Sequence, residues 1–203
     1  INGFRGMVRG QVEELNWMSV SGWVGLGGTQ LRSGRYDFEP DDLGRLERVL
    51  QQHGVRAMLV LGGLNAYHNV AELVRRRNRY PGFNIPIVCL PTTIDNSVPA
   101  TDYAVGADTA LNNIIQAVDK IKDTAGSTHR AFIVEVMGEQ CGYLPLMSAL
   151  ACGAERAYLP EDGIAVGRLE ADVEELREGF RSGKSLGIVI MGEYASHHYN
   201  TDV

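Results

Sequence analysis

The chain has 203 residues, of which 44% are hydrophobic and 22% are charged, a balance typical of a folded globular domain. Its formal net charge of −6 excludes the overall basic field that nucleic-acid binding requires. No apolar stretch approaches the roughly 18 residues of a membrane span, and we find no signal-peptide pattern. The three cysteines have neither metal-ligand spacing nor a disulfide framework, which indicates reduced thiols in an intracellular protein.

Residues 1–35 are rich in glycine, and we interpret them as a turn-rich connection. The stretch that begins at Gly25 and reads Gly-Leu-Gly-Gly lacks the third glycine of a dinucleotide-binding loop and follows no convincing strand, so it is a weak match. Arg32 and Arg35 flank this stretch. Each could reach a phosphate group or could be an ordinary solvated surface charge.

The spacing of apolar residues predicts alternating helices and strands over the rest of the chain. We expect helices at 38–53, 70–79, 104–123, 144–152 and 169–181, a loop at 125–128, and strands at 55–61, 85–90, 130–137, 154–159 and 186–191. We interpret the strand at 55–61 as one of the continuous apolar type that is expected when both faces of a sheet are covered. The alternation predicts an α/β fold with a three-layer, mainly parallel, Rossmann-like sheet flanked by helices.

Polar turns follow four of the expected strands, at 62–66, 91–102, 138–142 and 192–194. Because the carboxyl ends of parallel strands share one edge of a sheet, these turns predict a small-molecule site at that edge. In the first turn, Gly62 and Gly63 could let backbone N–H groups approach a phosphate. The two glycines could equally make only a tight turn.

The segment 91–102 is the most informative stretch of the sequence. Asp95 stands in a turn between two prolines and is flanked by Thr93, Asn96 and Ser97. A carboxylate in this position can act as a general base toward a substrate hydroxyl. Aspartate and asparagine are also ordinary turn formers and helix caps, so the local sequence leaves both interpretations open.

Three motifs, in this order and spacing, resemble the 6-phosphofructokinase family. They read Thr93-Ile-Asp-Asn, Thr101-Asp-Tyr-x-Val-Gly-x-x-Thr-Ala-Leu and Val134-Glu-Val-Met-Gly-x-x-Cys-Gly. The resemblance covers nearly the whole chain and implies the phosphofructokinase-like α/β fold. It also implies the family's glycolytic reaction, phosphorylation of fructose 6-phosphate to fructose 1,6-bisphosphate, with ATP or, in some members, pyrophosphate as donor and Mg²⁺ as the metal.

The resemblance implies roles for individual residues. Asp95 matches the catalytic aspartate that takes a proton from the sugar hydroxyl, and Thr93 matches the threonine that helps hold the transferring phosphoryl group. Arg130 matches an arginine that reaches the sugar phosphate of a neighbouring subunit, and Arg35 matches one that bridges the two substrates. The implied sugar-phosphate-binding residues are Arg130, Met137, Gly138, Glu139 and Glu193. The implied nucleotide or phosphate loop, in degenerate form, consists of Arg35, Gly62, Gly63 and Asn65.

The nucleotide side departs from the family's pattern. Where the family has Gly-Gly-Asp-Gly-Ser, with the aspartate serving Mg²⁺, this chain reads Gly62-Gly-Leu-Asn-Ala. The aliphatic Leu64 cannot serve a metal, and the side chain of Asn65 crowds a backbone approach that favours glycine. Glu139 stands where the family usually has an arginine that stabilises the transferring phosphoryl charge, and Ser97 where it usually has a second aspartate.

The residues implied for sugar binding are largely retained in this chain, whereas the implied nucleotide loop is altered. This combination resembles the carboxyl-terminal half of the duplicated, eukaryotic-type enzymes. In those enzymes the second copy of the fold binds regulatory ligands such as fructose 2,6-bisphosphate. Our first hypothesis is therefore a regulatory half that binds a fructose phosphate. The alternatives are a catalytic half in which Asp95 is the base, and a scaffold copy that binds no ligand.

The resemblance further implies an allosteric, cytoplasmic enzyme that works as a homo-oligomer or with a tandem partner half. Its ligand would be fructose 6-phosphate or fructose 2,6-bisphosphate, without nucleic-acid or membrane partners, and binding of ATP and Mg²⁺ by this segment is doubtful. Adjacent His197 and His198 diverge in a regular element, so no metal site is predicted. We expect residues 1–203 to be a fragment of a phosphofructokinase domain that lacks the amino-terminal glycine-rich nucleotide segment and the carboxyl-terminal His/Arg sugar-phosphate segment.

Overall fold

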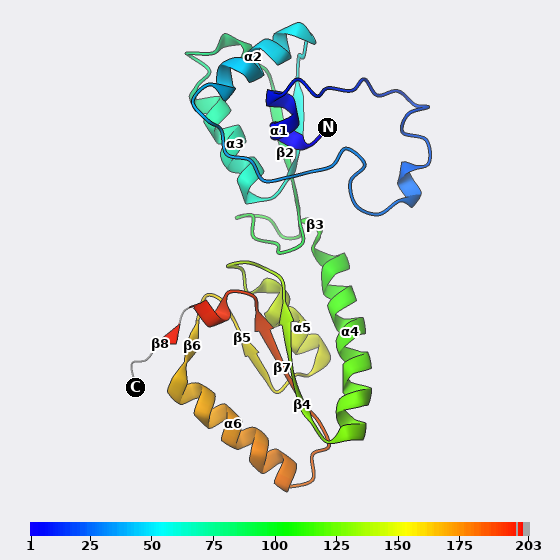
Figure 1. The fold of residues 1–203 in the computed structure, drawn as a ribbon, viewed down its shortest axis with the longest axis vertical. Helices are drawn as coiled ribbons and strands as arrows, with labels where there is room; N and C mark the ends of the chain where they lie inside the picture. Colours follow the sequence, from blue (N-terminus) through cyan, green and yellow to red (C-terminus); the bar gives the residue numbers. More distant parts are fainter. Residues whose placement is uncertain (198, 201–203) are drawn as a thin grey trace. The chain divides into compact units, whose positions relative to one another are not determined.

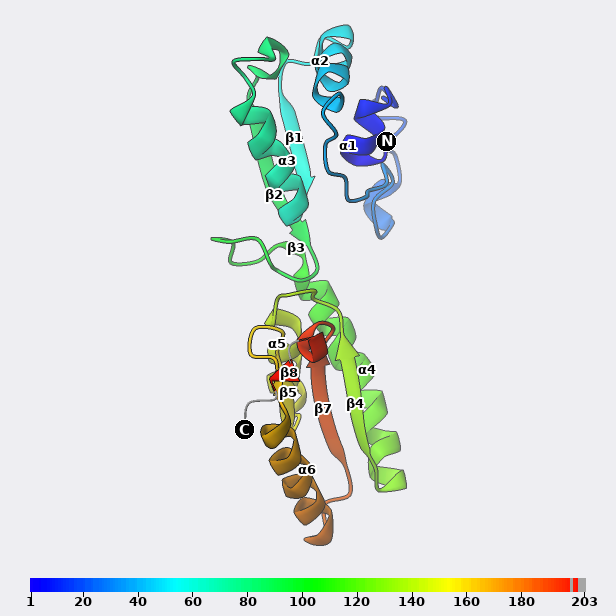
Figure 2. The ribbon, with the colours of Figure 1, turned by 60° about the vertical axis from the view of Figure 1, so that its left-hand side comes forward.

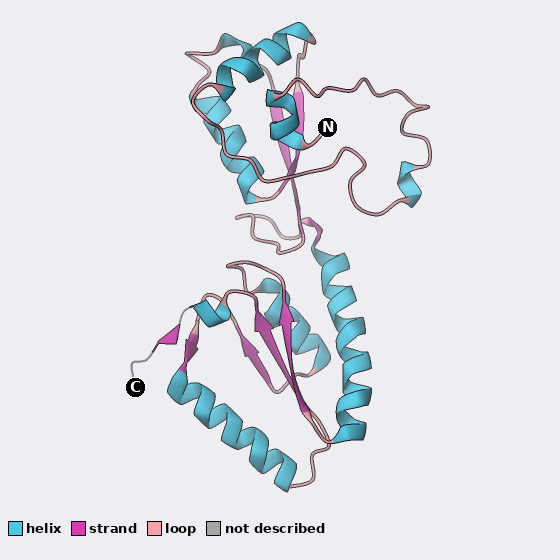
Figure 3. Cartoon of the chain, in the orientation of Figure 1, coloured by secondary structure: helices cyan, strands magenta, loops and turns pink. Residues whose placement is uncertain are grey.

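The structure, a computed structural model, describes the backbone of residues 1–197, 199 and 200 (Figure 1). The chain divides into two compact units, Ile1–Leu90 (unit 1) and Pro91–Val203 (unit 2). Helices and strands alternate along most of the described chain, which confirms the α/β class (Figure 3). The described strands form three sheets, ordered β1-β2-β3, β4-β7-β5 and β6-β8.

Unit 1 contains three helices, two short 3-10 helices and the beginning of the first sheet. In chain order the elements are α1 (Gly3–Val8), η1 (Trp23–Gly25), α2 (Asp42–Gln52), β1 (Met58–Gly62), α3 (Leu64–Arg75), η2 (Pro81–Phe83) and β2 (Ile87–Thr93). The last of these strands continues past Leu90 into unit 2. Residues 9–41 are mainly irregular, as the glycine-rich sequence predicts.

The core of unit 1 lies on one face of β1 and β2. Leu46, Leu73 and Phe83 are fully buried there, together with inward-facing side chains of the two strands. Figure 2 shows α3 lying along these strands. The alternate side chains of the strands point to the opposite face and are at least 44% exposed: Leu59, Leu61, Val88 and Leu90.

Unit 2 contains the remaining sheets and three α-helices. The elements are β3 (Val105–Gly106), α4 (Ala107–Thr128), β4 (Ala131–Val136), α5 (Tyr143–Cys152), β5 (Arg156–Tyr158), β6 (Ile164–Ala165), α6 (Val166–Arg181), β7 (Gly187–Gly192), η3 (Ala195–His197) and β8 (Tyr199–Asn200). Strand β7 lies between β4 and β5 and pairs with both in parallel.

The central sheet of unit 2 is the middle of three layers. Side chains of its central strand, β7, alternate between two cores, as the period of a strand requires. Phe132, Val134, Ile188 and Ile190 pack with α4 and α5, whereas Val189 and Met191 pack with Leu169 and Leu176 of α6. The three-layer, parallel arrangement predicted from the sequence is therefore present within unit 2.

A polar network joins α6 to the neighbouring strand β5. Tyr158 donates a hydrogen bond to Asp172 Oδ2 at 2.9 Å, and Arg156 Nε donates to Asp172 Oδ1 at 2.5 Å. Burial raises the pKa of Tyr158 to about 12, and the hydrogen bond to Asp172 acts in the same direction. Burial alone would raise the pKa of Asp172, but the bonds from Arg156 and Tyr158 outweigh it and lower that pKa below its usual value.

Several predicted boundaries were wrong. Helix α2 begins at Asp42 rather than 38, because the carboxylate of Asp42 accepts hydrogen bonds from the Glu39 N–H and the Tyr36 hydroxyl and holds the preceding residues out of the helix. The expected loop 125–128 is the last turn of α4. There the hydroxyls of Ser127 and Thr128 donate to carbonyls four residues earlier, and the helix ends only at His129, whose left-handed backbone, with φ of 51°, forms the C-cap.

Two further boundaries matter for the site. The helix expected from residue 104 is preceded by a short strand, β3, which pairs in parallel with Thr92 and Thr93 at the end of β2. The polar turn expected at 62–66 is mostly helix, because α3 already begins at Leu64 with Gly63 as its N-cap.

Candidate functional site

Asp95 lies two residues beyond the end of β2 and is buried, with 9% of its surface exposed. The hydroxyl of Thr93 donates a hydrogen bond to Asp95 Oδ1 at 2.6 Å. Ser97 donates to the same oxygen from its backbone N–H at 3.2 Å and from its hydroxyl at 2.9 Å. These three bonds fix the carboxylate through Oδ1, so that Oδ2 is the atom placed to accept a hydroxyl of a ligand.

The loop beyond Asp95 is closed by the next residue, Asn96. This asparagine has a left-handed backbone, with φ of 54°, which asparagine tolerates better than most residues. Its side chain accepts a hydrogen bond from the Ala104 N–H at 2.8 Å and donates to the Asp102 carbonyl at 3.0 Å. Asn96 therefore joins both ends of the loop and steadies the turn that carries Asp95.

The turn after β4 has an unusual backbone. Met137 is 63% exposed, Gly138 has φ of 156°, and Glu139 has φ of 50°. A Cβ atom at Gly138 would lie 2.8 Å from the carbonyl oxygen of Cys141, so that only glycine fits. The turn thus presents backbone and the Glu139 side chain beyond the end of the strand.

The effect of the Asp95 charge on the pKa of a thiol in this turn indicates that the two are close. Burial raises the pKa of the Cys141 thiol, and the negative charges of Glu161 and Asp95 raise it further against a lowering hydrogen bond from the backbone of Tyr143. Such an effect requires the charges to be close, because water screens charges that lie far apart. Asp95 therefore lies close to the turn that follows β4.

Glu193 joins the same edge of unit 2. It immediately follows β7, and its backbone N–H donates a hydrogen bond to the carbonyl of Val136, the last residue of β4, at 3.0 Å. We call Asp95, Gly138, Glu139 and Glu193 the edge cluster. Its three carboxylates can accept hydrogen bonds from the hydroxyls of a sugar, but they would repel a phosphate group.

Arg130 is not part of the edge cluster. It precedes β4, at the end of that strand opposite to Met137 and Gly138. A strand rises about 3.3 Å per residue, so the six residues of β4 separate Arg130 from the cluster by roughly 20 Å. Its side chain is exposed. The structure therefore does not place Arg130 with the sugar-contacting candidates of its own unit.

The glycine turn of unit 1 has a different character. Gly62 ends β1 and Gly63 caps α3 without a side-chain hydrogen bond to the cap. Asn65, in the first turn of α3, accepts a hydrogen bond from the Tyr36 N–H at 3.2 Å and donates to Asp37 Oδ1 at 2.8 Å. The side chain of Asn65, which was expected to crowd a phosphate, is thus hydrogen-bonded to the two residues that follow Arg35.

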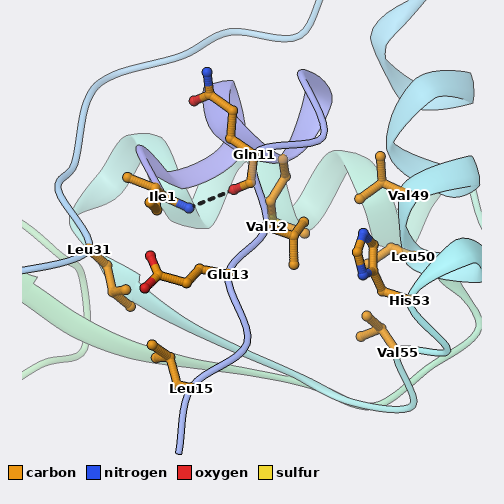
Figure 4. A pocket seen from close by; sticks show the side chains of 11 residues that line it. Ile1, Gln11, Val12, Glu13, Leu15, Leu31, Val49, Leu50, His53 and Val55 are labelled. Carbon is orange, nitrogen blue, oxygen red and sulfur yellow. Dashed lines mark hydrogen bonds between the residues drawn. The ribbon is translucent and has the colours of Figure 1, made fainter. Parts of the chain in front are cut away.

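Unit 1 also contains two hollows. Figure 4 shows the first, of about 200 Å³, which is lined largely by aliphatic side chains such as Val12 and Leu31, with the Ile1 amino group donating to the Gln11 carbonyl at 2.8 Å. The second, of about 510 Å³, lies between the N-terminus of α2 and α3 and includes Asn69. It has acidic and basic side chains in its wall, whereas the first lacks the convergent polar groups expected of a sugar-phosphate site.

The glycine turn of unit 1 does not fit a protein-held Mg²⁺ ion. Leu64 has no oxygen ligand, and the side-chain oxygen of Asn65 already accepts the Tyr36 N–H. Within residues 1–197 and 199–200, no three or more His, Cys, Asp or Glu side chains are arranged to hold a metal; His198 lies outside the described residues. No helix in the described part of the chain is long and apolar enough to cross a membrane.

Sequence reasoning missed two residues that shape these turns. Glu161 accepts a hydrogen bond from the Gly142 N–H at 2.6 Å and so holds the turn between β4 and α5. The available signal was an acidic residue in the turn beyond β5, three residues after Tyr158. Asn69 donates to the Tyr36 carbonyl at 2.7 Å; its signal was its spacing of four from Asn65, which places both on one face of α3.

A parallel α/β sheet with polar turns gathered where its strands end is the arrangement of a small-molecule-binding α/β protein. The comparisons with known proteins specify the family. A sequence profile described as phosphofructokinase matches residues 1–202. The ATP-dependent 6-phosphofructokinase of Dictyostelium discoideum is 41% identical and aligns with 98% of this chain and 24% of its own length. The platelet type from Mus musculus is 39% identical, over 99% of this chain and 26% of its own.

Solved structures agree with the sequence relatives. Phosphofructokinase from Pichia pastoris in the T-state has a TM-score of 0.89 at 38% identity and covers 96% of this chain and 23% of its own. The Saccharomyces cerevisiae phosphofructokinase has a TM-score of 0.91 at 36% identity, over 96% and 26%. The chain belongs to the phosphofructokinase family. It spans about a quarter of the length of the curated relatives that it matches.

Proposed function

We propose that the chain is the regulatory, fructose-phosphate-binding part of an ATP-dependent 6-phosphofructokinase. The names of its relatives support the whole-protein activity, phosphorylation of fructose 6-phosphate with ATP as donor. The observation that carries the regulatory role is a contrast between the two units. The edge cluster offers hydrogen-bond acceptors for sugar hydroxyls, whereas Leu64 and the engaged Asn65 leave the glycine turn without a metal ligand.

In this proposal, different residues of unit 2 bind different groups of the sugar. Asp95 Oδ2 accepts one sugar hydroxyl while Thr93 and Ser97 hold the carboxylate in place. Glu193 accepts another, at a position set by its backbone bond to β4. The exposed Arg130 serves the sugar phosphate of a neighbouring subunit in a homo-oligomer or of a tandem partner half.

A catalytic role is the second candidate, and one observation favours it. Asp95 is a buried carboxylate with one oxygen fixed by three hydrogen bonds, an arrangement suited to a general base. Glu139 counts against this role, because a negative charge in the turn after β4 disfavours the charge of a transferring phosphoryl group.

The Asp95→Asn substitution in the intact protein separates these roles. We would measure the maximal rate with ATP and fructose 6-phosphate, with and without fructose 2,6-bisphosphate. The regulatory role predicts an unchanged basal maximal rate with activation lost. A general base contributes about 10²–10⁴-fold, so a fall of that size would instead establish catalysis. Unchanged rate and activation would leave a scaffold copy. Asp162→Asn, at an exposed turn residue of unit 2, is the matched control.

A further inference from the structure

The larger hollow of unit 1 carries charges of opposite sign on its two walls. We call this hollow, of about 510 Å³, the charged hollow. The segment that leads into α2 contributes the carboxylates of Asp37, Glu39 and Asp41, and the C-terminal end of α3 with the turn that follows it contributes Arg76 and Arg79. Binding sites for small molecules typically occupy about 300–1,000 Å³, so the hollow is large enough for a small organic ligand.

The two sets of charges are not paired with each other. Arg76 Nε donates to Glu72 Oε1, on its own helix, at 2.7 Å, and the guanidinium of Arg79 lies over the ring of Tyr80, 5.6 Å from its centroid. Among the described residues, no ion pair joins either arginine to a carboxylate of the segment before α2. Both signs of charge therefore stay available to a ligand that carries one of each.

A buried amide in the wall of the charged hollow offers a further acceptor. Asn69 is 5% exposed and lines the hollow. Its Nδ2 donates to the Tyr36 carbonyl at 2.7 Å, but its Oδ1 receives no hydrogen bond from any described residue. No polar side-chain atom in the described part of the chain is both fully enclosed and unpaired, so this oxygen faces open space, which is the hollow. Because buried amide oxygens are normally paired, a ligand with an N–H donor fits here.

These groups match the charged end of an amino acid. An ammonium group has three donors, which suit Asn69 Oδ1 and the nearby carboxylates. A carboxylate suits a guanidinium group, which can bind it through two parallel hydrogen bonds. The remaining wall includes Phe38, Leu43 and Tyr80, which can contact an apolar side chain.

Simpler ions fit the charged hollow less well. An inorganic phosphate would meet the three carboxylates of the segment before α2 as well as the arginines, and like charges repel. A metal ion would meet two guanidinium groups, and no three His, Cys, Asp or Glu side chains within residues 1–197 and 199–200 are arranged to hold one. A wall with both signs of charge favours a ligand with both signs.

We propose that the charged hollow binds the ammonium and carboxylate groups of an amino acid with an apolar side chain. Asn69, Glu39 and Asp41 accept hydrogen bonds from the ammonium group, and Arg79 donates to the carboxylate. All of these residues belong to unit 1. The inference is independent of the proposed function, because it involves neither the edge cluster nor a fructose phosphate.

Three compounds with one carbon skeleton test the proposal on the intact protein. L-Phenylalanine carries both charges, 3-phenylpropionate lacks the ammonium group, and 2-phenylethylamine lacks the carboxylate. Titrations followed by saturation-transfer difference NMR would give the dissociation constant of each compound. Because each charged group makes at least one charge-assisted hydrogen bond, we expect both truncated compounds to bind at least about tenfold more weakly than L-phenylalanine.

Substitutions in the two walls assign the two charged groups. Arg79→Gln should weaken the binding of L-phenylalanine and 3-phenylpropionate about tenfold and leave 2-phenylethylamine unchanged. Glu39→Gln combined with Asp41→Asn should weaken L-phenylalanine and 2-phenylethylamine by a similar factor and leave 3-phenylpropionate unchanged. All three side chains are exposed, so these exchanges remove no buried contact, and circular dichroism would confirm that the variants are folded.

The matched control is another arginine of α3. Arg75 has a side chain that is 76% exposed and does not line the charged hollow. Arg75→Gln removes the same charge from the same helix and should leave the binding of all three compounds unchanged. Weakening by Arg75→Gln equal to that by Arg79→Gln would overturn the proposal, because the overall surface charge would then account for binding.

The other outcomes are equally distinct. Preference for L-phenylalanine together with opposite selectivity of the two wall variants would support the proposal. It would be overturned if L-phenylalanine showed no saturation transfer up to about 10 mM, ten times the concentration that half-fills a millimolar site. Equal binding of L-phenylalanine and a truncated compound would also overturn it, because one charge would then suffice. This comparison uses the wild type alone, so it holds even if a variant fails to fold.

Discussion

The two units of the chain use similar elements in different ways. In unit 2, helices cover both faces of the central strand β7, whose side chains alternate between two cores. In unit 1, helices cover only one face of β1 and β2, and Leu59 and Leu61 on the other face are each 61% exposed. Strand β1 of unit 1 and strand β7 of unit 2 are both apolar along their length, so that apolar runs alone do not distinguish a covered face from a bare one.

The same contrast holds where the strands end. The turns of unit 2 present carboxylates around an edge, fixed by neighbours such as Thr93 and Ser97. The glycine turn of unit 1 passes directly into α3, whose asparagines hold a separate segment of chain. Unit 2 thus presents hydrogen-bond acceptors where its strands end, whereas α3 of unit 1 holds a segment of its own unit.

The largest expected effect tests the difference in packing. Leu144→Ala in unit 2 and Leu46→Ala in unit 1 remove fully or almost fully buried side chains, and each should lower the free energy of unfolding by about 2–5 kcal/mol. Leu59→Ala, on the bare face, should change it by no more than about 0.5 kcal/mol. Chemical denaturation measures all three. A loss for Leu59→Ala as large as for Leu46→Ala would mean that this face is covered in the intact protein, and the comparison would fail.

The next effect concerns the polar network that holds α6. Asp172→Asn removes the charge that pairs with Arg156 and weakens the acceptor for Tyr158. We expect a loss of about 1–3 kcal/mol in the free energy of unfolding, as for a hydrogen bond to a charged group. Asp119→Asn breaks a pair with Lys122 in which the aspartate side chain is 61% exposed, and should cost under about 1 kcal/mol. Equal losses would contradict a special role for the buried network.

The pH dependence of stability follows from the same network. Tyr158 has a pKa raised from 10.0 to about 12, so its contribution is complete below pH 10 and is lost as the pH rises from 10 to about 12. Asp172 has a lowered pKa, so its contribution is present above 3.8 and is lost as the pH falls below that value. In Tyr158→Phe, the alkaline loss should be smaller and the acid loss should remain. Unfolding curves measured across this pH range would show it.

Much of the fold was predictable because its signals are local. The long strands and helices follow from apolar periodicity, and the motif around Asp95 stands out as a polar segment between a strand and a helix. The elements that were missed depend on distant partners. The strand β3 has only two residues and exists because it pairs with Thr92 and Thr93. Residues 125–128 belong to α4, which ends only where His129 adopts a left-handed backbone that the residue type does not announce.

The candidate site shows the same limit. Its carboxylates were found from their positions after strands, but the bonds that orient them join residues far apart in sequence. Glu161 is 19 residues from Gly142, and Asn69 is 33 residues from Tyr36. A single sequence does not state which of many polar residues meet across such distances. It indicates where a site lies better than it indicates how that site is held.

The smallest expected effect concerns the thiol pKa values of two cysteines, one in each unit. Burial raises the pKa of both thiols, but only Cys141 in unit 2 has a contribution from nearby carboxylates, Glu161 and Asp95, whereas Cys89 in unit 1 has burial alone. Glu161→Gln should therefore lower the pKa of Cys141 and speed its alkylation by iodoacetamide at pH 8, because a larger fraction is thiolate. Cys89, followed by mass spectrometry in the same sample, should react at an unchanged rate. Faster reaction of both would indicate loosened structure, and no change at Cys141 would remove the link between the turn and its carboxylates.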